Sequence, residues 1–255
     1  PAADLHPIVE VQSGYLFGAI SDGKWMKAEE AAKALQGETT YQVYGLTQAL
    51  GDAKGDKPKP ADGPCEETLA VSLSPETEKG VIAIAAPWNA LPRKPQVTDP
   101  TQKTYVDAVR EFLRTKEIDQ PKVKIDNILR VDLDGDGEDE VLISATNYFR
   151  KDDSVPMRSP AASYSMVLLR RVVAGKVETQ LIEGEFYPKA YPKAAQEEGR
   201  FDAPNAYKVI ATLDLDGDGK MEIVVGSNYY EGEAITIYRC DPKKCEALLS
   251  VGCGA

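Results

Sequence analysis

The sequence predicts a mainly β protein of antiparallel four-stranded repeats with one or two short helices. Three observations support this fold class. Residues 128–143 and 210–225 align without gaps at an offset of 82 residues, which indicates an internal repeat. Each copy has a β-branched, apolar run, an acidic, glycine-rich loop and a second apolar run, a pattern typical of two strands joined by a loop. Segments with helical periodicity are scarce.

Four strands are expected in each repeat, which places the repeats at 123–183 and 207–251. The strands are predicted at 123–131, 140–146, 164–170, 176–182, 207–213, 222–227, 234–239 and 245–251. Such units are typical of β-propeller blades or sandwich layers, because a single four-stranded meander cannot bury both of its faces. Chain length allows a small propeller of about four to six blades.

The first 99 residues supply further strands but no acidic loop. These strands are predicted at 15–20, 25–27, 41–46, 69–73 and 81–85. A helix is predicted from 100 to 116, with Asp99 as its N-cap, Pro100 at its first position and Gln102 placed for a capping box. A shorter helix is expected at 28–35. Loops rich in proline, glycine and charge are predicted at 51–64, 88–99, 150–162 and 187–205.

Two domain organisations fit these elements. In the first, residues 1–99 form a β-rich N-terminal region, and residues 100–255 contain the helix and both repeats. Segment 88–99 is then the best place for a boundary. In the second, the whole chain is one continuous domain. An α+β architecture with a separate N-terminal lobe is the alternative to the propeller-type fold.

Charge is concentrated in the two loops. The chain has 41 acidic and 30 basic residues and a net charge of −11. Residues 132–140 contribute −6 and residues 214–222 contribute −3. An acidic balance argues against nucleic acid and against an anionic membrane surface, which are both held by basic patches. The longest apolar stretch is far below the roughly 20 residues of a membrane-spanning helix, so none is predicted.

The pairing of the four cysteines bears on the cellular compartment in which the protein is found. Cys240 and Cys245 flank a short turn, and pairing them leaves Cys65 for Cys253. We expect these two disulfides and therefore a secreted, periplasmic or cell-surface protein. Free thiols in a cytosolic protein and a zinc site are the alternatives, and the lone His6 and the lack of a C-x-x-C pair weaken the zinc case.

Alternating carboxylates in the two loops predict metal binding. Like charges this close are costly unless a cation neutralises them. Calcium accepts six to eight oxygen ligands in a tolerant geometry, whereas magnesium demands an octahedron and retains its waters. We predict two calcium sites, with side-chain ligands at loop positions one, three, five and nine and a backbone carbonyl at position seven. The ligand residues are Asp132, Asp134, Asp136, Glu138 and Glu140, and Asp214, Asp216, Asp218, Lys220 and Glu222.

An EF-hand does not explain these loops. That motif requires a glutamate at position twelve and a helix on each side. Here position twelve is Ile143 or Val225, and strands are expected on both sides. The acid occurs at position nine instead, where the second strand begins.

The segment Asp-Leu-Asp-Gly-Asp-Gly-x-x-Glu, followed by Val-Leu-Ile or Ile-Val-Val, resembles the calcium-binding FG-GAP and VCBS-type repeats. Such repeats occur in integrin α-subunit propellers and in many secreted bacterial proteins. The resemblance covers 123–183 and 207–251 and implies a calcium loop between neighbouring strands of a propeller blade. Two features depart from the family pattern. Position nine is glutamate where the integrin form has aspartate, and the Phe-Gly and Gly-Ala-Pro signatures are not recognisable.

Binding is favoured over catalysis. His6 is expected in a mobile terminus, and no nucleotide-binding or zinc-protease motif occurs. Outside the loops, Glu183, Glu185, Glu197 and Glu198 are expected to be solvated. The aromatic groups at 147–149, 186–187, 191 and 228–230 suit protein or carbohydrate recognition, or else pack around strand ends. We therefore predict an interaction module for an unidentified protein or carbohydrate, with mainly structural calcium. The alternative is a glycan hydrolase on a propeller-like scaffold.

Overall fold

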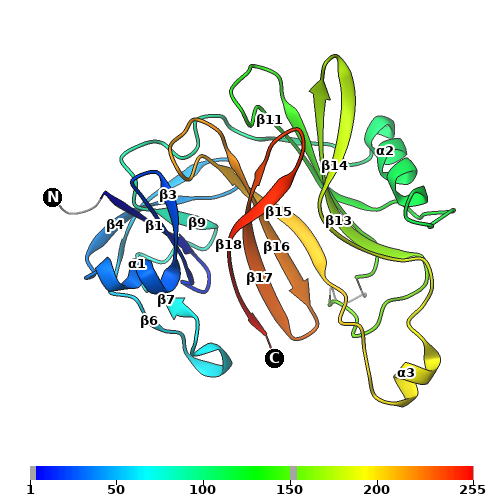
Figure 1. Ribbon diagram of the computed structural model, residues 1–255, viewed down its shortest axis with the longest axis horizontal. Helices are drawn as coiled ribbons and strands as arrows, with labels where there is room; N and C mark the ends of the chain where they lie inside the picture. Colours follow the sequence, from blue (N-terminus) through cyan, green and yellow to red (C-terminus); the bar gives the residue numbers. More distant parts are fainter. Residues whose placement is uncertain (1–3, 150–153, 255) are drawn as a thin grey trace.

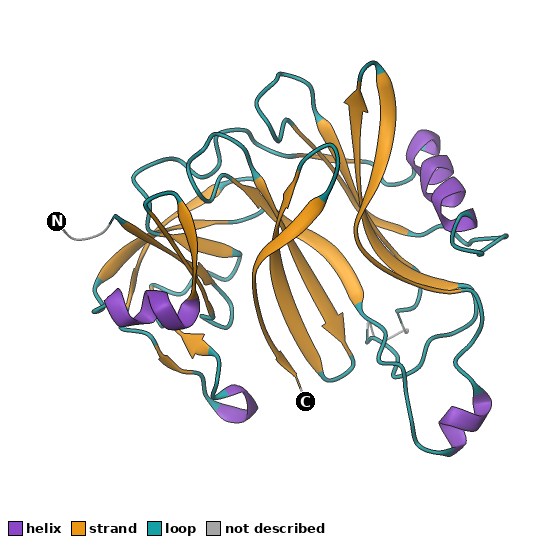
Figure 2. Cartoon of the chain, in the orientation of Figure 1, coloured by secondary structure: helices purple, strands orange, loops and turns teal. Residues whose placement is uncertain are grey.

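The computed structural model describes residues 4–149 and 154–254. This part of the chain is mainly β, with 46% strand, 11% helix and three α-helices. Three large antiparallel sheets lie side by side, with α1 (Ala28–Ala34) on one outer side and α2 (Lys103–Arg114) on the other (Figure 2). Among the described helices, none has the length and apolar character needed to cross a membrane.

The N-terminal sheet has seven strands in the order β3-β2-β1-β9-β4-β5-β8. It contains β1 (Leu5–Glu10), β2 (Leu16–Ser21), β3 (Lys24–Lys27), β4 (Thr39–Tyr44), β5 (Ala49–Gly55), β8 (Leu73–Ser74) and β9 (Ile82–Ile84). A small hairpin of β6 (Lys59–Pro60) and β7 (Leu69–Ala70) flanks the short 3-10 helix Gly63–Cys65. Because β9 pairs with both β1 and β4, it joins the two halves into one sheet.

The eight strands predicted for the two repeats are all present, in sequence order within each sheet. The first repeat has β11 (Ile125–Val131), β12 (Glu140–Thr146), β13 (Ser163–Val173) and β14 (Lys176–Tyr187), and the second has β15 (Ala206–Leu213), β16 (Glu222–Tyr229), β17 (Gly232–Cys240) and β18 (Cys245–Gly254). The first sheet gains β10 (Gln96–Thr98), which pairs with β11. The expectation of antiparallel four-stranded repeats is therefore confirmed.

The second repeat lies between the N-terminal sheet and the first repeat (Figure 1). Its strand β15 contacts β12 and β13, whereas β18 contacts β2 and β3. Ile223 and Val224 are successive residues on opposite faces of the middle sheet, and both are buried. The largest core cluster draws side chains from all three sheets. The spatial order of the sheets thus differs from their chain order, and the structure does not confirm a full propeller.

Buried serine hydroxyls form hydrogen bonds between the edge strand of the middle sheet and the sheet of the first repeat. The N–H groups of Tyr207 and Val209 on β15 donate to Ser165 Oγ (2.7 Å) and Ser144 Oγ (3.0 Å). Asn127 Nδ2 donates to the carbonyl of Val209 (3.3 Å). Both serines are fully buried. Backbone groups on this edge therefore have partners although no strand pairs with them.

The two predicted helices are present, but α2 begins later than expected. Its N-cap is Gln102, and residues 100–102 precede the helix. Asp99 instead accepts hydrogen bonds from the N–H and the hydroxyl of Thr101, both at 2.8 Å. These bonds lower the pKa of Asp99 and form a turn before the helix. Toward its core side, α2 buries Val109 and Leu113 against the outer face of the first repeat.

Several predicted loops contain short elements. Strands β5, β6 and β10 lie wholly or partly in the predicted loops 51–64 and 88–99, and α3 (Lys193–Glu197) lies in the predicted loop 187–205. Strand β1 was not expected. Short strands such as β10 depend on pairing with distant partners, which local composition does not reveal. The predicted loop 150–162 starts at 150–153, outside the described residues, and its described part is irregular.

The cysteine pairing is confirmed and the expectation for His6 is wrong. Disulfides join Cys65 to Cys253 and Cys240 to Cys245, which leaves no thiol for a zinc site. His6 lies in β1 rather than in a mobile terminus. Its ring is buried, with Nδ1 3.0 Å from the carbonyl of Ala85 and one edge against the indole of Trp88.

Candidate metal centre

The first acidic loop connects β11 to β12 and gathers three carboxylates. Asp132, Asp134 and Asp136 each offer an oxygen, and these oxygens lie within 4.8 Å of one another. The loop is held by its own backbone. Asp132 accepts hydrogen bonds from the N–H groups of Gly135 (2.6 Å) and Gly137 (3.1 Å), and Asp134 accepts one from Asp136 (3.3 Å). Alternate side chains are thereby turned toward one point.

The second loop, between β15 and β16, repeats this arrangement. The carboxylates of Asp214, Asp216 and Asp218 lie within 4.8 Å of one another. Asp214 accepts from the N–H groups of Gly217 (2.8 Å) and Gly219 (3.1 Å), and Asp216 accepts from Asp218 (3.3 Å). The same residue types at the same spacing thus form the same hydrogen-bond network twice.

The glutamates at position nine lie outside the three-carboxylate clusters. Glu140 Oε2 accepts the N–H of Leu133 at 2.8 Å, and Glu222 Oε2 accepts that of Leu215 at 2.9 Å. Both side chains are buried, and both are close enough to the aspartates for their charges to interact. Each glutamate therefore anchors the start of its loop, and its use as a direct ligand stays a prediction.

The residues at position seven differ in charge. Glu138 and Lys220 are exposed, and their N–H groups donate to Asp136 and Asp218, each at 2.8 Å. Only their backbone carbonyls were predicted as ligands. The side chains are therefore free to differ, although they change the charge around each loop.

An arginine neutralises part of the second loop. Arg239 on β17 bonds to Asp216 and to Glu222, the latter at 2.9 Å. Burial raises the pKa of Glu222 to about 8, and the charge of Asp216 adds to the rise, while Arg239 opposes it. In the first loop Arg171 lies near Glu140, but its Nε and Nη2 are buried without a hydrogen-bond partner among the described residues. The two loops thus differ in their nearby cations.

Segment 88–93 connects both loops to the N-terminal sheet. Arg93 donates from Nε to the carbonyl of Asp132, and from Nη2 to the carbonyls of Leu133 (3.1 Å) and Gly219 (2.7 Å). The loops also touch directly, because the N–H of Met221 donates to the carbonyl of Leu133 at 2.7 Å. One guanidinium and one backbone hydrogen bond therefore link the two acidic loops.

Trp88 covers the second loop. Its Nε1 donates to the carbonyl of Asp214 at 2.9 Å, and the N–H of Asp214 donates back to the carbonyl of Ala90 at 2.8 Å. Gly217 has a φ of +74°, and a Cβ added there would lie 3.0 Å from the indole. Glycine is thus required at this position both for the turn and for close packing. Sequence reasoning missed Trp88 and Arg93, because 88–99 was predicted to be only a loop.

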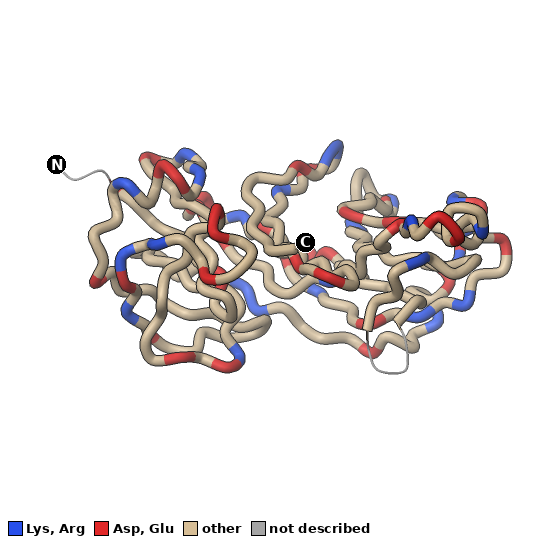
Figure 3. Tube along the Cα trace, turned by 90° about the horizontal axis from the view of Figure 1, so that it is seen from below, with Lys and Arg blue, Asp and Glu red and all other residues tan. Residues whose placement is uncertain are grey.

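Both clusters fit a hard divalent cation in their chemistry. Their potential ligands are carboxylate and carbonyl oxygens, which calcium prefers, without the nitrogen or sulfur ligands typical of zinc. Away from the loops, acidic and basic residues are intermixed along the chain (Figure 3). The concentrated negative charge is therefore a property of the two loops.

The other glutamates of interest have structural partners. Glu185 accepts hydrogen bonds from the hydroxyls of Tyr187 (2.7 Å) and Tyr207 (3.1 Å), and Glu183 accepts one from Tyr238. Both glutamates are partly buried, so the expectation of solvated side chains is wrong for them; Glu197 and Glu198 are exposed as expected. This network connects β14 to the middle sheet, which assigns these tyrosines to packing between sheets.

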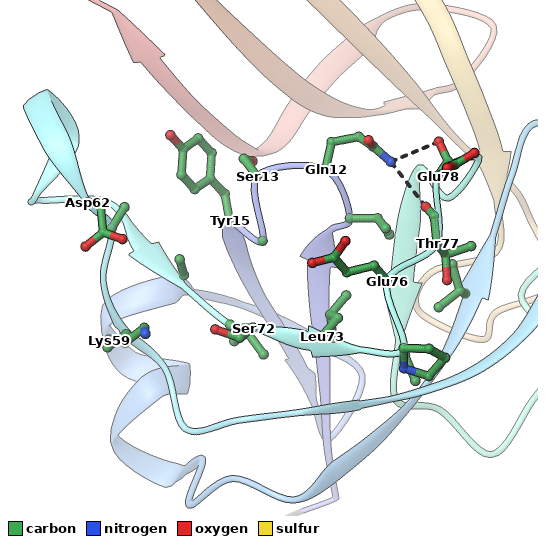
Figure 4. Close-up of a pocket in the computed structure, with 18 of the residues that line it drawn as sticks. Gln12, Ser13, Tyr15, Lys59, Asp62, Ser72, Leu73, Glu76, Thr77 and Glu78 are labelled. Atoms are coloured by element: carbon green, nitrogen blue, oxygen red, sulfur yellow. Dashed lines mark hydrogen bonds between the residues drawn. The ribbon is translucent and has the colours of Figure 1, made fainter.

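A cavity of about 530 Å³ opens beside the N-terminal sheet (Figure 4). Buried valines such as Val43 and Val71 contribute to its wall. Figure 4 shows the carboxylate of Glu76 pointing into it, while Gln12 Nε2 donates to the carbonyl of Thr77 (3.3 Å) at its rim. Its volume is within the usual range for a small-ligand site.

Comparison with known families matches residues 207–238 to the FG-GAP repeat. The match begins in β15, includes the second acidic loop and ends in β17, so it confirms the resemblance predicted from the sequence for this segment. Searches of curated proteins and of solved structures find no significant match to the chain.

Proposed function

We propose that the protein is a calcium-stabilised interaction module of an oxidising compartment, such as the cell exterior or the periplasm. The observation that carries this proposal is the duplicated carboxylate cluster, with the same hydrogen-bond network in both repeats. The carboxylates of such loops repel one another, and two bound calcium ions offset this repulsion. The disulfides and the FG-GAP match support the compartment and the interaction role.

Calcium has a structural role in this proposal. The loops meet segment 88–93, which leads from the N-terminal sheet, so ions there stiffen the junction of all three sheets. The ligand of the module is a protein or a carbohydrate, and the open cavities are its candidate contact surfaces. For the alternative of a glycan hydrolase, Glu183 and Glu185 are the partly buried glutamates outside the loops, and both accept hydrogen bonds from tyrosines.

Calcium titration tests the proposal. Isothermal titration calorimetry should give two calcium ions per chain, with dissociation constants of about 10⁻⁴ to 10⁻³ M, as for extracellular modules. At 10 mM calcium this corresponds to about 1.4 to 2.7 kcal/mol of stabilisation per site. The melting temperature should therefore rise when calcium is added and fall to its original value when EDTA is added. Magnesium should raise the melting temperature less than calcium does.

Single-loop variants provide the control. Asp134→Asn and Asp216→Asn should each remove one ion from the stoichiometry. Asp139→Asn should remove none, because this neighbouring carboxylate pairs with Arg130 and lies outside the cluster. If the wild-type melt is unchanged by calcium and calorimetry detects no binding, the proposal is wrong.

A further inference from the structure

A cavity of about 590 Å³ lies where the N-terminal sheet meets the two repeats. It is lined by the first residues of β15 and β17 and the last residues of β16, so it is at the strand ends opposite the acidic loops. The N-terminal region contributes Glu10, Gln12, Gly80 and Val81. Clefts between packed units of structure are common places for ligands.

One wall of this cavity is a single face of the middle sheet. Lys208 pairs with Gly226, and Gly226 pairs with Ile235, so these three residues are cross-strand neighbours. Cross-strand neighbours share a face. Ile210 and Ile235 are only half-buried there, and Val81 and Phe149 add further apolar surface. The middle of the cavity can therefore hold an apolar group.

The charged residues form two groups. Lys124 and Lys208 both lie close to Asp126, because both act on its titration. Glu10 and Glu233 both lie close to the hydroxyl of Tyr15, because both raise its pKa. Lys208 on β15 lies across two strand spacings from Ile235 on β17, and Glu233 is two residues further along β17, so the backbones of Lys208 and Glu233 are about 12 Å apart. A group of two lysines and one aspartate is thus separated from two glutamates across an apolar surface.

The exposed members of these two groups, Lys124, Lys208 and Glu233, are available to a ligand. Neither lysine forms an ion pair within 4.0 Å among the described residues, and the ammonium of Lys124 lies 5.4 Å from the centre of the Phe149 ring. Glu10 is buried, and its carboxylate oxygens accept hydrogen bonds from the N–H groups of Gln12 (2.8 Å) and Ser13 (2.6 Å), so Glu233 is the exposed carboxylate of this group. A ligand with a carboxylate at one end and an ammonium at the other complements both groups.

We propose that this cavity binds a short apolar peptide of two or three residues with both termini free. The carboxylate end pairs with Lys124 and Lys208, the ammonium end pairs with Glu233 beside Glu10, and the apolar side chains cover Ile210 and Ile235. A dipeptide or tripeptide spans the separation between the lysines and the glutamates, with the lysine and glutamate side chains closing the remaining distance. This proposal does not rest on calcium, because the acidic loops are at the other strand ends.

Calorimetry with leucyl-leucine and its blocked derivatives tests the proposal. The free dipeptide should bind about three- to fivefold more tightly than N-acetyl-leucyl-leucine, which lacks the ammonium, and than leucyl-leucine amide, which lacks the carboxylate. Lys208 and Glu233 are exposed, and an ion pair with an exposed side chain contributes at most about 1 kcal/mol, or about fivefold. If the free dipeptide does not bind at 10 mM, or if blocking its ends changes nothing, the proposal is overturned.

Variants assign each end of the ligand. Lys208→Gln should weaken binding of the free dipeptide to the level of the amide, while the acetylated form should still bind more weakly than the free dipeptide. Glu233→Gln should weaken binding of the free dipeptide to the level of the acetylated form, while the amide should still bind more weakly than the free dipeptide. Lys122→Gln and Glu231→Gln are matched controls, since both residues are exposed and neither lines the cavity. Equal effects in the variants and their controls would contradict the assignment.

Filling the cavity is an independent test that leaves the charges intact. Gly226 lines the cavity, its φ is not positive, and a Cβ added there would lie 3.4 Å from Ile210 Cγ2, an ordinary contact. Gly226→Phe should therefore fold with a melting temperature near that of wild type and lose dipeptide binding at least tenfold. A folded Gly226→Phe or Gly226→Val variant that binds the dipeptide as wild type does would place the ligand elsewhere.

Discussion

Arg93 is expected to be a large single contributor to the stability of the loop region. Its guanidinium donates to three backbone carbonyls, two in the first acidic loop and one in the second. Arg93→Met keeps much of the aliphatic stem but removes all three bonds. It leaves the carbonyls of Asp132, Leu133 and Gly219 without this partner at the junction of two sheets.

The magnitude follows from the number of bonds and their exposure. Bonds from a charged donor contribute about 1.5 to 3 kcal/mol each when buried. The Arg93 side chain is 25% exposed, so we take about 1 kcal/mol for each bond, or about 3 kcal/mol in all. For a chain of this size, that lowers the melting temperature by about 6 to 12 °C. Arg93→Lys should destabilise the protein by about two thirds as much as Arg93→Met, because one ammonium cannot bond to all three carbonyls.

Urea unfolding in excess EDTA measures this contribution from protein contacts alone. Arg130→Met is the matched control, because Arg130 on β11 pairs with Asp139 at 3.3 Å with side chains 47% and 31% exposed. A surface pair of that kind contributes at most about 1 kcal/mol. If Arg93→Met lowers the free energy of unfolding no more than Arg130→Met does, the bonds of Arg93 do not hold the two loops together.

Two further predictions concern the disulfides and pH. Replacing Cys65 and Cys253 by serine opens a loop of 188 residues and should cost about 5 kcal/mol, against about 2 kcal/mol for the 5-residue loop of Cys240 and Cys245. Urea midpoints check this order, and the reverse order would contradict it. Burial raises the pKa of Asp126, so folding favours its protonated form and stability should fall as pH rises from its ordinary value near 4 through the raised value. Asp126→Asn should remove this fall and stabilise the protein at pH 7; an unchanged pH profile would refute the assignment.

The sequence predicted those features that depend on neighbouring residues. Strand β12 has the expected bounds, because the segment from Glu140 to Thr146 is a continuous, largely apolar run that pairs with both β11 and β13. The aspartate clusters were also visible, since their ligands fall within five consecutive positions. Cys240 and Cys245 flank a turn of four residues, so their pairing was local as well.

Features set by distant contacts were not predicted. Two repeats of the same pattern do not show which of them packs against the N-terminal sheet, and the answer depends on contacts such as those between β18 and β2. Arg93 lies 126 residues from Gly219, and no local pattern marks an arginine that will bond to backbone carbonyls. His6 was expected to be mobile because of its position in the chain, whereas its burial comes from Ala85 and Trp88.

The two acidic loops, although alike in backbone, should not bind calcium equally. Residues 132–140 carry −6 and residues 214–222 carry −3. Two units of the difference come from Glu138 in place of Lys220, and the third comes from Asp139, which pairs with Arg130 outside the cluster. Arg239 also bonds to Asp216, so a cation entering the second loop must displace that contact. The Asp216→Asn variant, which retains the first loop, should therefore bind calcium at least about tenfold more tightly than Asp134→Asn, which retains the second. Because Arg239 opposes cation binding at the second loop, adding Arg239→Met to Asp134→Asn should narrow the difference in calcium affinity between the two loops. Equal affinities in the two single-loop variants at low ionic strength would mean that the shared geometry of the loops, rather than their charge, determines calcium affinity.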